Sequence, residues 1–371
     1  MKILYGVQAT GNGHITRARA IAPYLKKAGC DVQYLFSGRK KEDLFDMEPF
    51  GDYWVRPGLT FVTNRGRVQL IETAIHNNIF KLISDCRTLD VSEYDLVITD
   101  FEPIVAWAAK KAGKTCIGVG HQYAFHHDIP MVGDTFFAKQ VLKKFAPVTI
   151  GLGLHWHHFD QPILPPIAEV YGHGTAAAPN KIVPNKILVY LGFESREEVV
   201  ELLKPFKDYE FYYYTTVTEP LDDGNIHIRP LSREGFQKDL ADSSGVICNS
   251  GFELISEAIL LGKKILAKPL KGQMEQYSNA LALEILGLGN VMNQLNHQSI
   301  ENWLYTSKGK QVIYPDVAKA IVDWILMGQW DDQSSLIESL WQQVNCPSHP
   351  DFKEADWYKS EQNPFEKASA S

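Results

Sequence analysis

Residues 249–258 read NSGFELISEA, residues 261–269 read LGKKILAKP, and residues 275–280 read EQYSNA. The pattern predicts a strand, a Ser-Gly turn, a short helix that stops at a glycine, a second strand, and a second helix. This order is typical of an α/β protein. It places Ser250, Gly251, Glu257 and Gln276 around the carboxyl ends of two neighbouring parallel strands, where ligands of open α/β sheets bind.

The residue types in this block favour nucleotide-sugar binding. A helix amino terminus behind a Ser-Gly turn suits a diphosphate. Glu257 stands on an otherwise apolar helix, and a carboxylate there can accept hydrogen bonds from two ribose hydroxyls. Glu257 alone would fit a solvated surface acid equally well. Its combination with Ser250, Gly251, and the acid and amide of Glu275 and Gln276 favours a binding site.

Composition bounds the class of protein. A chain of 371 residues with 45% hydrophobic content predicts two packed domains. The net charge of −7 and the pI of about 6.0 argue against a nucleic-acid partner. The five cysteines show no Cys-x-x-Cys spacing and fit a reducing compartment. No apolar run is long enough to span a bilayer, so we expect a cytoplasmic protein.

The first half of the chain predicts a parallel, doubly wound sheet in a domain of residues 1–160, because strands and helices alternate. Strands are predicted at 2–8, 31–36, 95–99, 115–119 and 148–154, and helices at 15–27, 68–85 and 104–112.

The second half predicts another α/β domain, over residues 186–330. A segment rich in Pro, Gly and Ala over residues 161–185 predicts the linker. In the second domain, strands are predicted at 186–191, 210–214, 225–228, 245–248 and 264–267, and helices at 194–203, 252–261, 276–286 and 317–327. Residues 331–371 predict one more amphipathic helix near 335–344 and a polar tail.

Two turns in the first half carry candidate catalytic residues. Gly11, Asn12, Gly13 and His14 link the first strand to the first helix, and the glycines let a ligand approach the backbone. Asp100 ends another strand of the same sheet. If the two side chains meet, the carboxylate would fix the tautomer of His14 and make it a general base for a hydroxyl. The alternatives are an ordinary turn for His14 and a helix cap for Asp100.

Two further turns in the second half are candidate donor contacts. Gly192 and Ser195 follow the first strand of that domain and could face a phosphate, or Ser195 could simply cap the next helix. Arg229 and Leu231 follow another strand. They could hold the base through backbone groups, unless the arginine is structural.

Histidines and one basic helix raise two further interpretations. His121 follows a strand, and more histidines occur at 126–127 and 155–158. Imidazole suits zinc, but no acid or thiol stands at a ligand spacing, so we predict no metal and assign His121 to the acceptor side. Residues 136–145 are basic and amphipathic. They fit a packed surface helix or peripheral contact with an anionic membrane.

Taken together, the motifs resemble the MurG-like branch of the GT-B glycosyltransferases over most of residues 1–330. The resemblance rests on the 11–14 turn and on the block that contains Ser250, Gly251, Glu257 and Gln276. It implies an α/β fold of two Rossmann-like domains facing a cleft, with a metal-independent, inverting transfer and no cofactor. It also implies that Glu257 binds the donor ribose, that Ser250 and Gly251 lie by the diphosphate, and that Gln276 contacts the sugar.

The same resemblance implies a UDP-sugar donor, with TDP and GDP open as alternative nucleotides, and a hexosyl- or N-acetylhexosaminyltransferase of cell-envelope or polysaccharide biosynthesis. The acceptor stays open among glycans, lipid-linked molecules and small molecules, because residues 192–195 replace the Gly-Gly-Ser turn of the family. Three alternatives also stay open. They are a nucleotide-sugar hydrolase of the PseG type, which shares the Gly-x-Gly-His-x-x-Arg start, a UDP-sugar epimerase, and a non-catalytic nucleotide-sugar binding protein.

Overall fold

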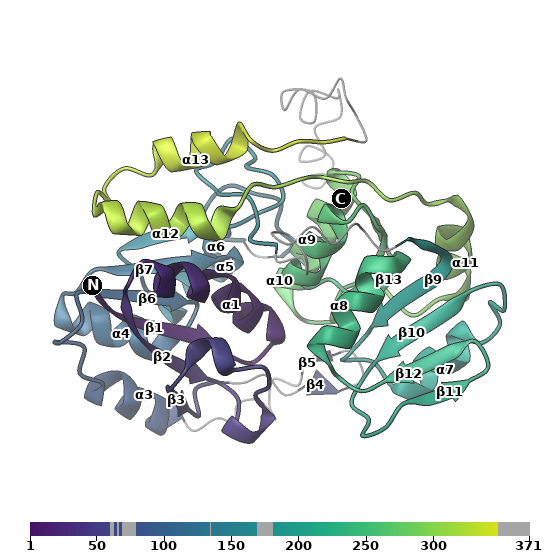
Figure 1. The fold of residues 1–371 in the computed structure, drawn as a ribbon, viewed down its shortest axis with the longest axis horizontal. Helices are drawn as coiled ribbons and strands as arrows, with labels where there is room; N and C mark the ends of the chain where they lie inside the picture. The colour runs from purple at the N-terminus through teal and green to yellow at the C-terminus, as the bar shows by residue number, and fades with distance from the viewer. Residues whose placement is uncertain (60–62, 65–66, 69–78, 134, 169–180, 348–371) are drawn as a thin grey trace.

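The computed structural model describes residues 1–59, 63–64, 67–68, 79–133, 135–168 and 181–347. These residues form two α/β units, each built on its own sheet (Figure 1). The predicted α/β class with two parallel, helix-covered sheets is confirmed. The predicted tail, and residues 169–180 of the predicted linker, lie outside the described residues.

The first unit contains a six-stranded parallel sheet in the order β3-β2-β1-β6-β7-β8. Its central strands are buried on both faces, as the near-continuous apolar run of residues 2–8 requires. The strands are β1 (Lys2–Gln8), β2 (Asp31–Ser37), β3 (Tyr53–Arg56), β6 (Leu96–Asp100), β7 (Cys116–Gly120) and β8 (Ile150–Gly153). Short β4 (Thr63–Asn64) and β5 (Arg67–Val68) form a separate antiparallel pair.

The helices of the first unit are α1 (Asn12–Lys27), α3 (Ile79–Thr88), α4 (Pro103–Ala112), α5 (His121–Ala124) and α6 (Thr135–Phe145), with 3-10 turns η1 (Lys41–Asp43) and η2 (Glu48–Phe50). The predicted helix over 68–85 is wrong at its start, because residues 67–68 form β5 and α3 begins only at Ile79. Part of that range, residues 69–78, lies outside the described residues.

The second unit has a seven-stranded sheet in the order β11-β12-β10-β9-β13-β14-β15. Six of its strands run parallel, and β11 pairs antiparallel with β12. The strands are β9 (Val183–Tyr190), β10 (Glu210–Tyr214), β11 (Leu221–Asp223), β12 (Ile226–Arg229), β13 (Ser243–Asn249), β14 (Lys264–Lys268) and β15 (Asn290–Val291). The helices are α7 (Arg196–Leu203), α8 (Arg233–Asp242), α9 (Phe252–Leu260), α10 (Met274–Ile285) and α11 (His297–Thr306).

The last two helices, α12 (Val317–Met327) and α13 (Ser334–Trp341), return to the first unit and lie above its sheet (Figure 1). Helix α12 contacts α1, and the hydroxyl of Tyr24 in α1 donates to Asp316. The indole of Trp341 donates to the carbonyl of Ile163 at 2.6 Å. Helix α12, which the sequence analysis assigns to the second domain, therefore packs beside the first sheet.

The two units meet through a continuous apolar core. Trp156 of the first unit stacks on Phe252 of the second, with ring centroids 5.2 Å apart. Both rings are buried. This packing brings α1 against α9 and so places the amino-terminal turn beside the Ser250 turn.

Candidate functional site

The turn after β1 and the end of β6 bring His14 and Asp100 together. Val7 in β1 pairs in register with Asp100, so the carboxyl ends of the two strands lie side by side. Gly11 caps α1 in an extended conformation, and His14 stands in the first turn. Its Nδ1 lies 2.7 Å from Oδ1 of Asp100. The predicted pairing of the two residues is therefore present, and Asp100 is not the cap of α4, since Glu102 takes that position.

Asp100 is fully buried yet stays ionised. Burial by itself would raise its pKa, but the charges of Arg17 and His14 outweigh burial and hold the pKa below its ordinary value. Arg17 donates from Nε to Oδ2 at 2.7 Å and from Nη2 to Oδ1 at 2.6 Å. An ionised carboxylate only accepts hydrogen bonds, so Nδ1 of His14 donates in this contact, and in the neutral form of the ring the lone pair is on Nε2.

Arg17 also joins the two units, because its Nη1 donates to the carboxylate of Glu253 in the first turn of α9. The side chain of Arg17 is 1% exposed and that of Glu253 is 17% exposed. Sequence reasoning used Arg17 only for the hydrolase alternative and missed Glu253. The available signal was an acid two residues after Gly251, which a helix start explains without any partner.

On the other side, the Asn249–Ser250 turn presents buried polar atoms that have no partner among the described residues. The hydroxyl of Ser250 and the Oδ1 of Asn249 are two such atoms. The backbone of the turn is firmly held, since Asn279 donates to the Ser250 carbonyl at 3.0 Å and Asn249 donates to the Lys268 carbonyl at 3.2 Å. Unpaired buried groups in a native fold call for water or a ligand.

Helix starts differ between this region and the rest of the molecule. Helices α4, α7, α8, α11 and α12 each begin with a side chain that accepts a hydrogen bond from the first turn. Helices α1, α9 and α10 have no such side-chain cap within the described part of the chain, and neither do the short α5 and α13. No cap side chain therefore occupies the first-turn N–H groups of α1, α9 and α10, and such groups suit an anion or water.

The turn after β9 is built differently from the predicted phosphate turn. Ser195 caps α7, accepting from the backbone N–H of Glu198. The side chain of Glu194 is 5% exposed and pairs with Lys268 at 2.7 Å, a pair that sequence reasoning missed. Gly192 is exposed beside this ion pair. The cap role of Ser195, one of the two predicted alternatives, is the one present here.

Three further donor candidates lie on α9 and α10. Glu257 is buried, with 7% of its surface exposed. Oε1 of Gln276 accepts from the N–H of Leu270 at 2.8 Å, and this contact fastens α10 to the loop after β14. Glu275 accepts from Nε2 of Gln122 in the first unit at 3.1 Å.

Arg229 and Leu231 lie at the end of β12. The guanidinium of Arg229 donates to Asp222 at 2.8 Å and lies over the ring of Tyr212, so its charge is directed to the β11–β12 hairpin. Leu231 is 42% exposed. This arrangement fits the structural alternative for Arg229 and leaves the backbone near Leu231 accessible.

His121 is part of the contact between the units. It is fully buried and stacks on Phe252 with ring centroids 3.9 Å apart. Its Nδ1 lies 2.8 Å from the Leu154 carbonyl and its Nε2 lies 2.6 Å from Oδ1 of Asn279. The predicted acceptor-side residue therefore has no surface to offer an acceptor in this arrangement. Asn12, another predicted acceptor-side residue, is half-buried, and its Oδ1 accepts from Arg39 at 2.8 Å.

The histidines at 155–158 stabilise their own loop. Ring nitrogens of His155, His157 and His158 accept from backbone N–H groups one or two residues onward at 2.8 Å. Burial lowers the pKa of His157 to about 3. Across the described residues, no group of three His, Cys, Asp or Glu side chains is placed to hold a metal ion.

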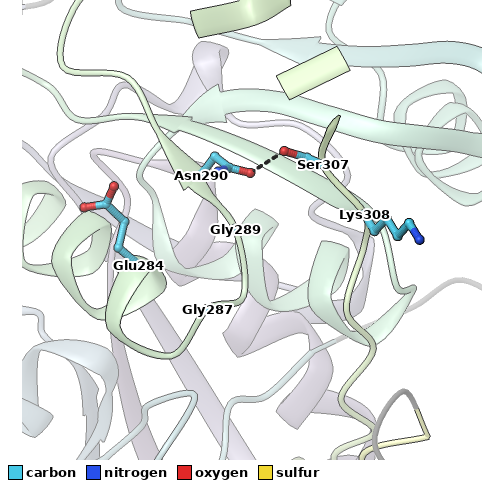
Figure 2. A pocket seen from close by; sticks show the side chains of 6 residues that line it. All are labelled: Glu284, Gly287, Gly289, Asn290, Ser307 and Lys308. Carbon is cyan, nitrogen blue, oxygen red and sulfur yellow. Dashed lines mark hydrogen bonds between the residues drawn. The ribbon is translucent and has the colours of Figure 1, made fainter. Parts of the chain in front are cut away.

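Two hollows lie away from these residues. One, of about 360 Å³, is lined by Glu284, Asn290, Ser307 and Lys308 beside two glycines, and Ser307 donates to Asn290 across it at 2.7 Å (Figure 2). The other, of about 390 Å³, lies between β8 and the turn that joins α12 to α13. Neither hollow is lined by a predicted site residue. The candidate site is therefore the region around His14, Asp100 and the Ser250 turn.

Helix α6 is the basic amphipathic segment that the sequence predicts. Its Val141 is 48% exposed. Among the helices described, none is both long enough and apolar enough to cross a membrane.

A family model described as Glycosyl transferase family 1 matches residues 1–307. A search of curated proteins finds no match. Among solved structures, the spinosyn rhamnosyltransferase SpnG is similar with a TM-score of 0.57 and 16% identity, covering 92% of this chain and 100% of that one.

Two other solved structures show the same likeness. The glycosyltransferase SnogD from Streptomyces nogalater has a TM-score of 0.53 and 15% identity, with 92% and 99% of the two chains covered. MurG from Acinetobacter baumannii has a TM-score of 0.51 and 15% identity, with 88% and 99% covered. These identities show the fold alone, the GT-B fold of two Rossmann-like domains. MurG is no closer than the others, so the MurG-like branch stays a prediction.

Proposed function

Because this chain belongs to glycosyl transferase family 1, we propose that it moves a sugar from a nucleotide-diphosphate sugar to a hydroxyl of an acceptor. One observation carries the proposal: the 2.7 Å contact between Nδ1 of His14 and the buried carboxylate of Asp100, beside the Ser250 turn. We propose a UDP-sugar as the donor, with a hexosyl or N-acetylhexosaminyl group as the sugar.

His14 acts as the general base in this proposal. Asp100 holds the proton on Nδ1, and Nε2 accepts the proton of the acceptor hydroxyl as the acceptor oxygen bonds to the anomeric carbon. In the same step the bond from that carbon to the diphosphate oxygen breaks. A direct displacement inverts the anomeric centre. The side chain of His14 is 14% exposed, so the ring is held but can be reached.

The leaving diphosphate is met by the uncapped start of α9. We propose that the N–H groups behind Gly251 and the hydroxyl of Ser250, which has no other partner among the described residues, donate to the oxygens on which negative charge develops. We propose that these neutral donors take the place of a metal ion in stabilising the leaving group. Gly192 and Gly11 let the two backbones approach the same phosphates, next to Asn12, Gly13 and Ser195.

The rest of the donor follows α9 and α10. We propose that Glu257 accepts from the two ribose hydroxyls, that Glu275 and Gln276 contact the transferred sugar, and that backbone groups near Leu231 and Arg229 hold the base. His121 then supports the acceptor side from within the core rather than by contact. Acceptor chemistry stays open among glycans, lipid-linked molecules and small molecules.

The test begins with donor binding. We would titrate the pure protein with UDP, dTDP, GDP and their sugars and follow the melting temperature, which a ligand of the folded state raises. One nucleotide should give a clear rise that Glu257→Ala removes. The matched control is Glu338→Ala, an exposed acid on α13, which should leave the rise intact. No rise with any nucleotide would contradict the proposal.

Turnover separates the alternatives. Sugar transfer that needs an acceptor supports the glycosyltransferase. Sugar release without acceleration by any acceptor indicates the hydrolase, and conversion of one nucleotide sugar into another indicates the epimerase. Binding without turnover indicates a non-catalytic role.

We also propose that α6 touches the inner face of a membrane. Exposed Val141 and Trp107 stand with Lys110 and Lys144 on one side of the first unit, where Trp107 donates to the Lys144 carbonyl. Apolar and basic groups together suit an anionic bilayer. The protein should sediment with phosphatidylglycerol vesicles and not with phosphatidylcholine vesicles. Sedimentation with neither kind of vesicle would contradict membrane contact and favour the alternative, that α6 is a packed surface helix.

A further inference from the structure

Glu253 belongs to the second unit, but through Arg17 it is connected to the His14–Asp100 dyad of the first unit. We infer that Glu253 is a positioning residue, which through Arg17 keeps His14 in the tautomer that can accept a proton while the two units are docked. The inference deepens the proposed function and rests on it. Domain docking and the state of the base would then be coupled in one hydrogen-bonded chain.

The geometry of Arg17 makes this coupling rigid. Its Nε and Nη2 bind the two oxygens of Asp100, and its Nη1 binds Glu253. A guanidinium is planar, so fixing one of its edges fixes the direction of the others. The bidentate pair with Asp100 sets the plane of the guanidinium, and Glu253 holds its third nitrogen, Nη1, in that plane.

The atoms around Arg17 show what Glu253 prevents. Nη2 of Arg17 lies 3.0 Å from Nδ1 of His14 as well as 2.6 Å from Asp100. Without Glu253, the buried Nη1 loses its acceptor, and the guanidinium gains by turning toward another one. If Arg17 donates to Nδ1 of His14, the ring proton moves to Nε2, and Nε2 can no longer accept the proton of a hydroxyl.

Gly13 is shaped for this contact. A Cβ atom at Gly13 would lie 2.6 Å from Oε2 of Glu253. The obstacle is the end of a flexible side chain, so Gly13→Ala should fold but push the carboxylate away from Arg17. Gly13→Ala and Glu253→Ala are therefore two independent ways to break the same contact.

The same interface offers a matched control. Trp156 of the first unit donates to Ser256 at 2.9 Å, three residues along α9 from Glu253. Ser256 has no contact with the dyad in any described hydrogen bond. Ser256→Ala loosens the docking of the units by one buried hydrogen bond and leaves Arg17, Asp100 and His14 as they are.

The first experiment reads the tautomer without any substrate. In protein labelled with 15N-histidine, the long-range proton–nitrogen spectrum distinguishes Nδ1–H from Nε2–H, and His14→Ala identifies the signals of His14. Wild type and Ser256→Ala should show Nδ1–H. Glu253→Ala and Gly13→Ala should gain Nε2–H. An Nδ1–H signal that persists unchanged in Glu253→Ala would overturn the inference.

The second experiment reads turnover with the donor that the nucleotide titration identifies. Glu253→Ala should lower kcat about tenfold while the Kd for the bare nucleotide stays within about twofold. Glu253→Gln, which keeps an oxygen for Arg17, should recover most of the rate. An equal loss of kcat in Ser256→Ala would contradict the inference, since docking alone would then explain it. If wild type binds no nucleotide, the proposed function fails while the tautomer still decides this inference.

Discussion

The two sides of the interface differ in how far the protein satisfies its own polar groups. On the first side, His14, Asp100 and Arg17 form a closed set in which the buried charges are paired. On the second side, the Ser250 hydroxyl and Asn249 Oδ1 are buried with no partner in the described residues. A base must be oriented before substrate arrives, whereas a binding turn saves its hydrogen bonds for the ligand.

The largest expected effect is on kcat and comes from removing His14, on the first side of the interface. His14→Ala should lower kcat about a thousandfold, because it removes the imidazole whose Nε2 is proposed to accept the proton of the acceptor hydroxyl. The Kd for bare UDP should change little, since the nucleotide is proposed to lie on the second side. Initial rates and calorimetric titration measure the two quantities. A loss of UDP affinity as large as the loss of kcat would contradict this division of roles.

The second effect is on stability and comes from removing the negative charge of Asp100, on the same side. Asp100→Asn removes the buried carboxylate that binds two nitrogens of Arg17, leaves Glu253 as the remaining ionic partner, and should lower the free energy of unfolding by about 3 kcal/mol. Urea denaturation followed by circular dichroism measures the loss. Asp223→Asn, at an exposed ion pair with Lys204, is the control and should change stability very little. Similar losses in both variants would mean that Asp100 is not a buried structural charge.

The third effect is on the pH dependence of stability and concerns His157, in the loop of residues 155–158, and His126. Burial lowers the pKa of His157 to about 3 and that of His126 to about 4, from 6.5. Below pH 6.5 and down to these lowered pKa values, the two histidines bind protons in the unfolded chain but not in the folded one. The free energy of unfolding therefore falls as the pH drops below about 6.5. At pH 5, His157 alone should cost about 2 kcal/mol relative to pH 7.

Urea denaturation at pH 7 and pH 5 measures this slope. His157→Asn is the matched variant, because an amide oxygen can accept the N–H of Phe159 in the same kind of turn and does not titrate. Its stability should vary less with pH than that of wild type. An unchanged pH dependence would place the proton uptake elsewhere.

The same contrast explains what could be predicted from sequence. Strands such as β1 and β6 follow from local apolar runs, and the turns that carry His14 and Ser250 follow from glycine and from strand ends. Arg17–Glu253 and Glu194–Lys268 join residues 236 and 74 positions apart, and each partner has an ordinary local explanation in its own helix or strand. The sequence predicts α12 in the second unit because it follows that unit along the chain, and its apolar face carries no sign of which unit covers it.

The smallest expected effect sharpens the second side by comparing two serines of one turn and helix. Ser256 has two partners, the Phe252 carbonyl and the Trp156 indole, so Ser256→Ala should cost about 1 kcal/mol of unfolding free energy. Ser250→Ala removes a hydroxyl that has no partner among the described residues, so the ligand-free protein should be as stable as wild type. The same variant should weaken UDP about fivefold, because the ligand is what the hydroxyl binds. Urea denaturation with and without UDP gives both values, and a destabilised ligand-free Ser250→Ala protein would show that the turn is already satisfied by the fold.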